Sequence, residues 1–246
     1  MFWDHGKIRL MISVVVPACN EEKYLAVTLA AVKAAGRHLS SRVEVLVVDN
    51  ASTDGTAAVA RRAGATVVHE PTRSVATARN TGAAAASGDL LVFVDADTAV
   101  PETLLEHIER VMHHSACLGG AVDVKHASKR RMVRMYLALW RFVGLTLGMA
   151  QGATQFCRRD VFAELSGYDQ TLWMGEDVDF YWRLRHLARR MNARVAFIRD
   201  VHVVPSPRRF DQWPLWKIFV YTNPLIAALF RRRRATWKGW YDELVR

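Results

Sequence analysis

The stretch LLVFVDADT, residues 90–98, decides the fold of this chain. Its apolar run is typical of a strand that is buried on both faces, and the run ends abruptly in Asp95 and Asp97. Residues i and i+2 of a strand point to the same side, so we expect both carboxylates to face one place. The pattern predicts a buried strand that delivers two acids to one edge of a sheet.

Strand-like and helical patterns alternate around this stretch. In the first half, β-branched runs predict strands at residues 12–18, 43–49, 66–70 and 90–97. Helices are expected from about Glu21, from Thr53 or Asp54, and through an alanine-rich segment that ends near Gly88. Strands this continuously apolar are covered on both faces, so the sequence predicts a parallel α/β sheet. Ligands of such sheets lie beyond the carboxyl ends of the strands.

Polar residues follow three of the expected strands at those ends. They are Asn20, Glu21, Asp49, Asn50, Asp95 and Asp97. Each one alone has a structural explanation, since Asn20 could cap a helix and STDGT, residues 52–56, is a good helix start. Their occurrence together on one rim is better explained by a binding site.

The second half continues the alternation with a helix after Pro101, a strand at 117–124, a helix at 174–190 and a late strand at 194–204. The helix at 174–190 opens with acids and closes with arginines, which suits the helix dipole. With 246 residues and 51% hydrophobic content, the chain is long enough to bury a full core. We expect one domain.

Cysteine usage and charge narrow the setting and the partner. The three cysteines lie far apart without a CxxC pair, and the N-terminus predicts a strand in place of a signal peptide. This favours a reducing, cytoplasmic setting. The 34 basic and 24 acidic residues give a net charge of +10, which indicates an anionic partner. The arginines accompany apolar helices and no groove-reading motif, so we expect no nucleic acid.

Two carboxylates at i and i+2 suit a hard divalent cation, because Mg²⁺ or Mn²⁺ is commonly held by one or two carboxylates plus phosphate oxygens. A D-x-D triplet alone occurs by chance in many proteins, but its position at a strand end strengthens the prediction. The cation would bridge the protein and a diphosphate.

Four segments together resemble glycosyltransferase family 2, whose members have the GT-A fold. They are VVVPACNEEKYL (14–25), VLVVDNASTDGT (45–56), ATARNTGAAAASGDLLVFVDADT (76–98) and GEDVDFYWRL (175–184). The order and spacing are those of the family, and the likeness extends over residues 12 to about 204. It implies an α/β, Rossmann-like, mostly parallel sheet flanked by helices, followed here by C-terminal amphipathic helices.

The resemblance implies a role for each matching residue. The implied donor-nucleotide contacts are Pro17, Ala18, Asn20, Glu21, Asp49, Asn50, Arg79 and Asp95. Asn50 stands where many members carry a second Asp. Arg79 either pairs with phosphate or orients the metal-site loop. The implied ligands of Mn²⁺ or Mg²⁺ are Asp95, Asp97 and His202, although a lone histidine in a strand also has a structural interpretation.

Asp177 matches the acid proposed as catalytic base in the family. An acceptor hydroxyl must lose its proton as it attacks the anomeric carbon, and a carboxylate within hydrogen-bond reach takes it. A single displacement inverts the configuration. Glu176, Arg208 and Arg209 are expected to contact the diphosphate or the acceptor. The alternatives are acids that only favour a helix N-terminus and a solvated basic turn.

Two apolar segments, 132–150 and 213–230, are about as long as a membrane span, but charged residues or a proline interrupt both. The second is accompanied by the tryptophans Trp213, Trp216, Trp237 and Trp240 and by the arginines at 231–234. Two interpretations are open. The second segment is either a helix lying in the interface of an anionic membrane or a core helix with a solvated end.

We therefore predict a single GT-A domain over 1–246, with a donor half at about 1–100, an acceptor and catalytic half at about 101–204, and a basic, membrane-associating tail at about 205–246. The expected enzyme is cytoplasmic, at the inner face of the membrane, and transfers sugar from a UDP- or GDP-sugar to a glycan or lipid-linked acceptor.

Three other functions share part of this pattern. A polyprenyl-phosphate sugar synthase would suit the membrane-seeking segments. A sugar nucleotidyltransferase would need a glycine-rich phosphate loop, which PACNEEKYL (17–25) lacks. A nucleotide-binding protein without catalysis would not need Asp177 beside Asp95 and Asp97.

Overall fold

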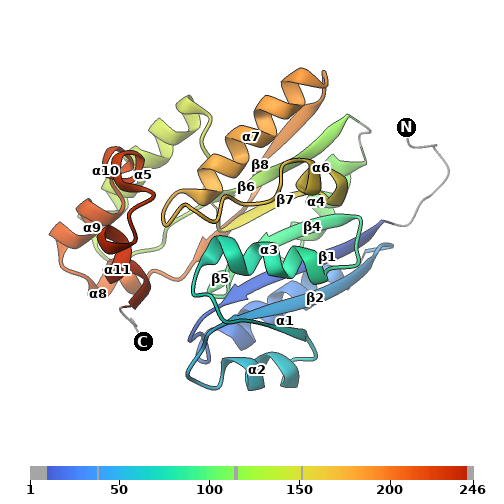
Figure 1. The fold of residues 1–246 in the computed structure, drawn as a ribbon, viewed down its shortest axis with the longest axis horizontal. Helices are drawn as coiled ribbons and strands as arrows, with labels where there is room; N and C mark the ends of the chain where they lie inside the picture. The colour runs from blue at the N-terminus through green and yellow to red at the C-terminus, as the bar shows by residue number, and fades with distance from the viewer. Residues whose placement is uncertain (1–9, 38, 114–115, 151, 243–246) are drawn as a thin grey trace.

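The computed structural model describes residues 10–37, 39–113, 116–150 and 152–242. Across these residues an eight-stranded sheet has the order β3-β2-β1-β4-β7-β6-β8-β5, and helices cover both of its faces (Figure 1). The strands are β1 (Met11–Ala18), β2 (Arg42–Asn50), β3 (Thr66–Glu70), β4 (Leu90–Val94), β5 (Thr98–Ala99), β6 (Cys117–Val124), β7 (Thr154–Arg158) and β8 (Arg194–Pro205).

The first four strands form a parallel sheet, as predicted. Ala18 of β1 pairs with Asp49 of β2, and Val15 pairs with Phe93 of β4, so the carboxyl ends of these strands meet at one edge. Beyond β4 the sheet becomes mixed, because β7 runs antiparallel between β4 and β6. Neither β7 nor β5 was predicted from the sequence; β5 has only two residues and is too short to show a pattern.

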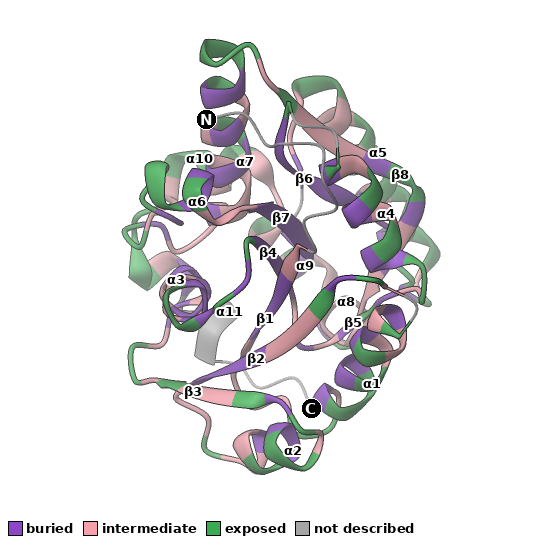
Figure 2. Ribbon diagram, turned by 90° about the vertical axis from the view of Figure 1, so that its right-hand side faces the viewer, coloured by how far each residue is buried: buried purple, intermediate pink, exposed green. Residues whose placement is uncertain are grey.

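Two groups of helices cover the sheet, and each buries its own core. The helices α1 (Leu25–Gly36), α2 (Thr56–Arg62) and α4 (Leu104–Met112) pack on one face. The helices α3 (Val75–Ala85), α6 (Arg159–Glu164) and α7 (Glu176–Arg190) pack on the other. Figure 2 shows the buried strands β1 and β4 between these two layers. The first two helices begin later than expected, α1 because residues 21–24 form a turn in front of it.

A third group of helices lies at one side of the sheet (Figure 1). It consists of α5 (Arg131–Leu147), α8 (Arg208–Gln212), α9 (Leu215–Tyr221), α10 (Pro224–Phe230) and α11 (Arg234–Asp242). Val133 and Leu137 of α5 pack against Trp213 and Ile218. Asn223 separates α9 from α10 and caps α10 by accepting a hydrogen bond from the Leu225 amide at 2.9 Å.

The interfacial interpretation is wrong for two of the four tryptophans. Trp213 is 4% exposed and Trp237 is fully buried, because both pack among the C-terminal helices, whereas Trp216 is 65% exposed. The side chain of Trp240 lies outside the described residues. Among the helices that the structure describes, none has the length and apolar character needed to cross a bilayer.

Candidate active site

A cleft of about 790 Å³ opens at the carboxyl ends of β1 and β4. The predicted site residues that line it are Pro17, Asn20, Glu21, Asn50, Arg79, Asp95, Asp97, Glu176, Asp177, Arg208 and Arg209. Ala18, Asp49 and His202 are not part of its lining. The strand register and the helices after the strands thus gather most of the predicted residues around one cavity.

Arg79 on α3 joins the two halves of the site. Its side chain is 3% exposed and donates hydrogen bonds to Asp95 at 2.9 Å and to Glu176 at 2.8 Å. The guanidinium also donates to the carbonyl of Gly152 and lies 5.1 Å from the ring centre of Tyr168. Burial works to lower its pKa, but the carboxylates, Asp95 first, outweigh burial and raise it. These contacts support the positioning role of Arg79 over direct phosphate binding.

Arg208 makes the corresponding connection on the other side of the cleft. Its guanidinium lies 3.2 Å from Asp97 and donates a short hydrogen bond to Glu21, and it stacks over the Tyr24 ring at 4.5 Å. The backbone brings the two sides together, since the Ser206 amide donates to the carbonyl of Asp97 at 3.0 Å. Burial raises the pKa of Asp97 to about 6, which Arg208 only partly offsets.

The acids of this region fit a divalent cation. Asp95 and Asp97 both line the cleft, and the raised pKa of Asp97 indicates that the positive charge of Arg208 does not fully offset the burial of its carboxylate. One carboxylate oxygen of Glu21 is buried without a hydrogen-bond partner among the described residues. Mg²⁺ and Mn²⁺ need only one or two protein carboxylates when phosphate oxygens and water complete the shell.

The third expected ligand is not brought into this group. His202 lies on β8, where its backbone is in register with that of Asp123 on the neighbouring strand β6. Within the described part of the chain, no three His, Cys, Asp or Glu side chains come close enough to hold a metal together. Of the three expected ligands, the cleft lining therefore includes Asp95 and Asp97 and not His202.

Asp177 stands at the start of α7, and the backbone fixes its position. Gly175 precedes the helix with φ of 75°, a left-handed conformation that favours glycine. The Asp177 carboxylate accepts hydrogen bonds from the amides of Gly152 at 2.5 Å and Val178 at 2.8 Å. A Cβ atom at position 152 would lie 2.4 Å from that of Asp177, so only glycine fits there.

The environment of Asp177 suits a general base. Burial raises its pKa to about 7, and the neighbouring Glu176 adds to this, while Arg79 and the two amide hydrogen bonds oppose it. A base with a pKa near the working pH combines a large unprotonated fraction with a strong pull on the proton. The carboxylate is half-buried and lines the cleft, so a hydroxyl group in the cleft has access to it.

The loops after β1 and β2 are held together by their own polar side chains. Asn20, with φ of 57°, accepts a hydrogen bond from the Thr53 amide at 2.7 Å. Asn50 accepts from the Ser74 amide and donates to two carbonyls of the loop after β3. Asp49 is only 8% exposed. These residues shape the edge of the cleft at the carboxyl ends of β1 and β2, and Asn50 has all its amide groups engaged within the chain.

Sequence reasoning missed several residues of the site. They are Tyr24, Gly152, Gln155, Tyr168 and the pair Asp123–Arg141. Asp123 was accessible to the same rule that found the other acids, because it lies near the carboxyl end of the strand expected at 117–124. Gly152 and Gln155 carry no local signal, since their roles depend on the approach of α7.

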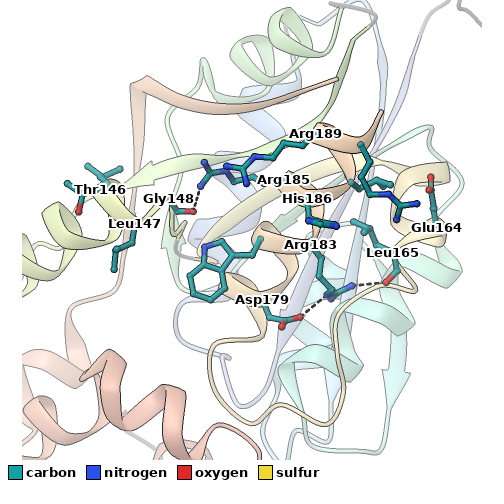
Figure 3. A pocket seen from close by; sticks show the side chains of 14 residues that line it. Thr146, Leu147, Gly148, Glu164, Leu165, Asp179, Arg183, Arg185, His186 and Arg189 are labelled. Carbon is teal, nitrogen blue, oxygen red and sulfur yellow. Dashed lines mark hydrogen bonds and ion pairs between the residues drawn. The ribbon is translucent and has the colours of Figure 1, made fainter. Parts of the chain in front are cut away.

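A second, shallower pocket of about 900 Å³ lies between the end of α5 and α7 (Figure 3). Two of its arginines are engaged in structural contacts. Arg183 donates to Asp179 and to the carbonyl of Leu165, both at 2.7 Å, and Arg185 donates to the carbonyl of Gly148 at 2.9 Å. Asp95, Asp97 and Asp177 do not line this pocket, so it is not the candidate active site.

The chain also matches a known protein family. The family model for glycosyl transferase family 2 matches residues 13–166, more than half of the chain. The chain belongs to this family. An uncharacterized glycosyltransferase of Mycobacterium tuberculosis is 44% identical over 86 residues, 35% of this chain and 36% of that protein, so the match spans about a third of the relative. Glycosyltransferase AglE of Haloferax volcanii is 27% identical over 82% of this chain and 68% of its own length.

Solved structures share the GT-A fold. The mannosyltransferase PcManGT of Pyrobaculum calidifontis, in complex with GDP-Man and Mn²⁺, superposes with a TM-score of 0.63 at 24% identity, over 80% of this chain and 57% of that one. Glucosyl-3-phosphoglycerate synthase of M. tuberculosis, with Mn²⁺, UDP and its product, gives 0.60 at 22% identity, over 91% and 80%. At this identity the likeness concerns the fold, and it confirms the α/β GT-A prediction.

Proposed function

We propose that this glycosyl transferase family 2 chain transfers a sugar from a UDP- or GDP-sugar to an acceptor hydroxyl, with inversion at the anomeric carbon. One observation carries the proposal. Arg79 bridges Asp95, next to the end of β4, to Glu176, at the start of α7, so the donor-side acids and Asp177 line one cleft. The nucleotides bound to the structural neighbours, GDP-Man and UDP, support a nucleotide-sugar donor.

The donor half, up to about residue 100, would bind the nucleotide sugar through the loops after β1 and β2. Asp95 and Asp97 would hold Mn²⁺ or Mg²⁺ there, and the Mn²⁺ of the neighbours supports this choice. Such an ion stabilises the departing nucleoside diphosphate as a Lewis acid. Arg79 keeps Asp95 in place, and Arg208 does the same for Asp97.

The half from about 101 to 204 would hold the acceptor, a glycan or a lipid-linked glycan, and supply the base. Asp177 takes the proton of the acceptor hydroxyl while the amides of Gly152 and Val178 fix the direction of its carboxylate. The acceptor oxygen attacks the anomeric carbon from the face opposite the diphosphate. This single displacement accounts for inversion.

The region from about 205 to 246, together with α5, would keep the protein on the cytoplasmic face of an anionic membrane. The support comes from α5, where an apolar stripe is 57–65% exposed at helical spacing: Met132, Met135, Leu139 and Phe142. The arginines expected to bind lipid contribute less, since Arg231 lies 3.6 Å from Asp179 and Arg232 lies 3.7 Å from Asp169.

The experiment for the proposed function measures donor binding and transfer with and without divalent cations. Thermal stability should rise with UDP- or GDP-sugar only when Mn²⁺ or Mg²⁺ is present, because a ligand that binds the folded state alone stabilises it. EDTA should abolish transfer, and added Mn²⁺ should restore it. Full transfer in chelator would contradict the role given to Asp95 and Asp97. The matched control is Asp160→Asn, which changes an acid outside the cleft.

A further inference from the structure

The cleft does not end at the catalytic carboxylates. It continues between α5 and α10, where its lining includes Leu137, Trp140 and Val143 on one side and Pro224, Leu225 and Ala228 on the other. We call this part the apolar arm. None of these six side chains is charged, in contrast to the acids and arginines around Asp97 in the same cleft.

The apolar arm presents hydrocarbon surface without a partner. Leu225 is 69% exposed, and Leu147 at the end of α5, which also lines the cleft, is 62% exposed. A folded domain ordinarily buries such groups, and contiguous exposed apolar surface marks an interaction site. Contact of this apolar surface with water is unfavourable in free energy, and a bound hydrocarbon chain would replace that contact.

One polar atom in the apolar arm also lacks a partner. The indole nitrogen of Trp140 is buried and has no hydrogen-bond acceptor among the described residues. A buried indole N–H normally finds an acceptor. Trp140 lies one residue before Arg141, whose guanidinium is bound to Asp123 near the end of β6. An oxygen atom of a bound molecule at this level of the cleft would satisfy the indole.

We propose that the apolar arm binds the hydrocarbon chain of a lipid acceptor whose hydroxyl-bearing head group reaches Asp177. The position given to the head group rests on the proposed function. Binding of the hydrocarbon chain in the apolar arm does not require catalysis. In the transfer, the O–H bond of the head group breaks and its proton goes to Asp177. The oxygen bonds to the anomeric carbon as the bond from that carbon to the diphosphate oxygen breaks and the nucleoside diphosphate leaves.

The continuity of the cleft favours a lipid over a protein segment as the occupant. The arm and Asp177 share one cavity of about 790 Å³, which also has to hold the nucleotide sugar. A single hydrocarbon chain fits beside a donor in that volume, and a helix, with a diameter of about 10 Å, does not. A lipid also has a polar head group joined to an apolar chain, which matches the polar part of the cleft next to its apolar part.

Gly144 offers a way to fill the apolar arm. It lines the cleft on α5, and a Cβ atom there would meet only that of Met149, at 3.7 Å, within 4 Å. Gly144→Phe should therefore fold and place its ring in the arm. Ala138→Phe is the matched control, because Ala138 is exposed on the same helix and is not part of the cleft lining. Ala228→Phe, from the opposite wall, is a second arm-filling variant should Gly144→Phe not fold.

The probes are dodecyl β-glucoside, below the concentration at which it forms micelles, and methyl β-glucoside. Calorimetry should show that the dodecyl compound binds the original protein and Ala138→Phe equally and binds Gly144→Phe at least tenfold more weakly. The methyl compound should bind none of them measurably. Thermal stabilisation by nucleotide sugar and Mn²⁺ should be unchanged in Gly144→Phe, which shows that the donor site is intact.

Equal binding of the dodecyl compound to the original protein and Gly144→Phe would overturn the proposal, and so would equal binding of both glucosides. Light scattering that showed a dimer dispersed by the dodecyl compound would also overturn it, because a second copy would then occupy the arm. Failure of the proposed function has a different signature. In that case the dodecyl compound would bind in the apolar arm as predicted, but no donor binding or sugar transfer would be found with any acceptor.

Discussion

Two parts of the cleft are organised by different forces. One is the group of charged residues Arg79, Asp95, Asp97 and Arg208, which we call the donor rim, and the other is the apolar arm. On the donor rim, charged side chains are bound to each other, as in the contacts of Arg79 with Asp95 and of Arg208 with Asp97. In the apolar arm, packing between α5 and α9 holds the walls, and the walls themselves carry exposed apolar side chains. The rim has its charges in place before any ligand binds, which lowers the cost of binding a charged donor.

The difference also separates the effects expected from substitution. Removing one member of the buried rim leaves another charge without its partner, which is costly. Removing an exposed apolar side chain near the arm changes the folded state little, so its effect should appear in binding.

Arg79→Met should lower the free energy of unfolding by about 3–5 kcal/mol, the usual cost of breaking a buried ion pair. The reason is that Asp95 and Glu176 both lose their partner. Denaturant titration measures the change. Arg110→Met is the matched control, since Arg110 is 60% exposed and its ion pair is with the similarly exposed Glu106, so it should cost below about 1 kcal/mol. Equal losses in the two variants would show that the rim is not a buried charge network.

Asp177→Asn should cut turnover by about 10²-fold or more while donor binding stays intact, because the asparagine amide accepts no proton. Asp97→Asn should lose donor and metal binding together. Calorimetry and product formation, measured on both variants, give the contrast. Asp179→Asn serves as the control, since its carboxylate is engaged with Arg183 at 2.7 Å. Similar loss of donor binding in Asp177→Asn and Asp97→Asn would contradict the division of roles.

Turnover should fall about tenfold per pH unit below about pH 7, because Asp177, with its pKa raised to about 7 by burial, becomes protonated there. The effect on stability has the opposite sign. The folded state binds this proton more tightly than the unfolded chain, whose value is near 3.8, so the contribution of Asp177 to the free energy of unfolding falls as pH rises from about 4 to 7. Pre-steady-state rates and denaturant titrations across this range measure both. An Asp177→Asn variant with an unchanged stability profile would argue against the raised pKa.

Met135→Gln combined with Leu139→Gln should weaken binding to anionic vesicles severalfold and leave the unfolding free energy within about 0.5 kcal/mol, since both side chains are more than half exposed. Vesicle sedimentation measures the binding. Val27→Gln, which changes a 69% exposed apolar residue on α1, is the control and should bind as before. The membrane proposal fails if the double variant and the control sediment alike, or if the unaltered chain binds no vesicles.

Local pattern was enough to predict the donor half of the fold. The strands β1 to β4 follow continuous apolar runs, and polar residues at their ends follow from where each run stops. Because parallel strands bring their carboxyl ends to one edge, the meeting of Asn20, Asn50 and Asp97 around one cleft was predictable before the structure. Asp177 was found through the family motif, since its pattern alone equally suits a helix start.

Tertiary structure decided the features that depend on which distant segments meet. Arg208 and Glu21 are 187 positions apart and meet because β8 pairs with β5 beside Asp97. The need for glycine at position 152 exists only once α7 brings Asp177 against it. Trp237 is buried by its packing in the C-terminal group, whereas the composition of this segment left both an interfacial and a core helix open. Hydrophobic periodicity reports which side of an element is apolar, and it does not report which partner, protein or lipid, covers that side. For α5, the structure shows that protein covers one face, where Val133 and Leu137 pack against Trp213 and Ile218. The apolar residues of its exposed face and Leu225 of the apolar arm have no such cover among the described residues.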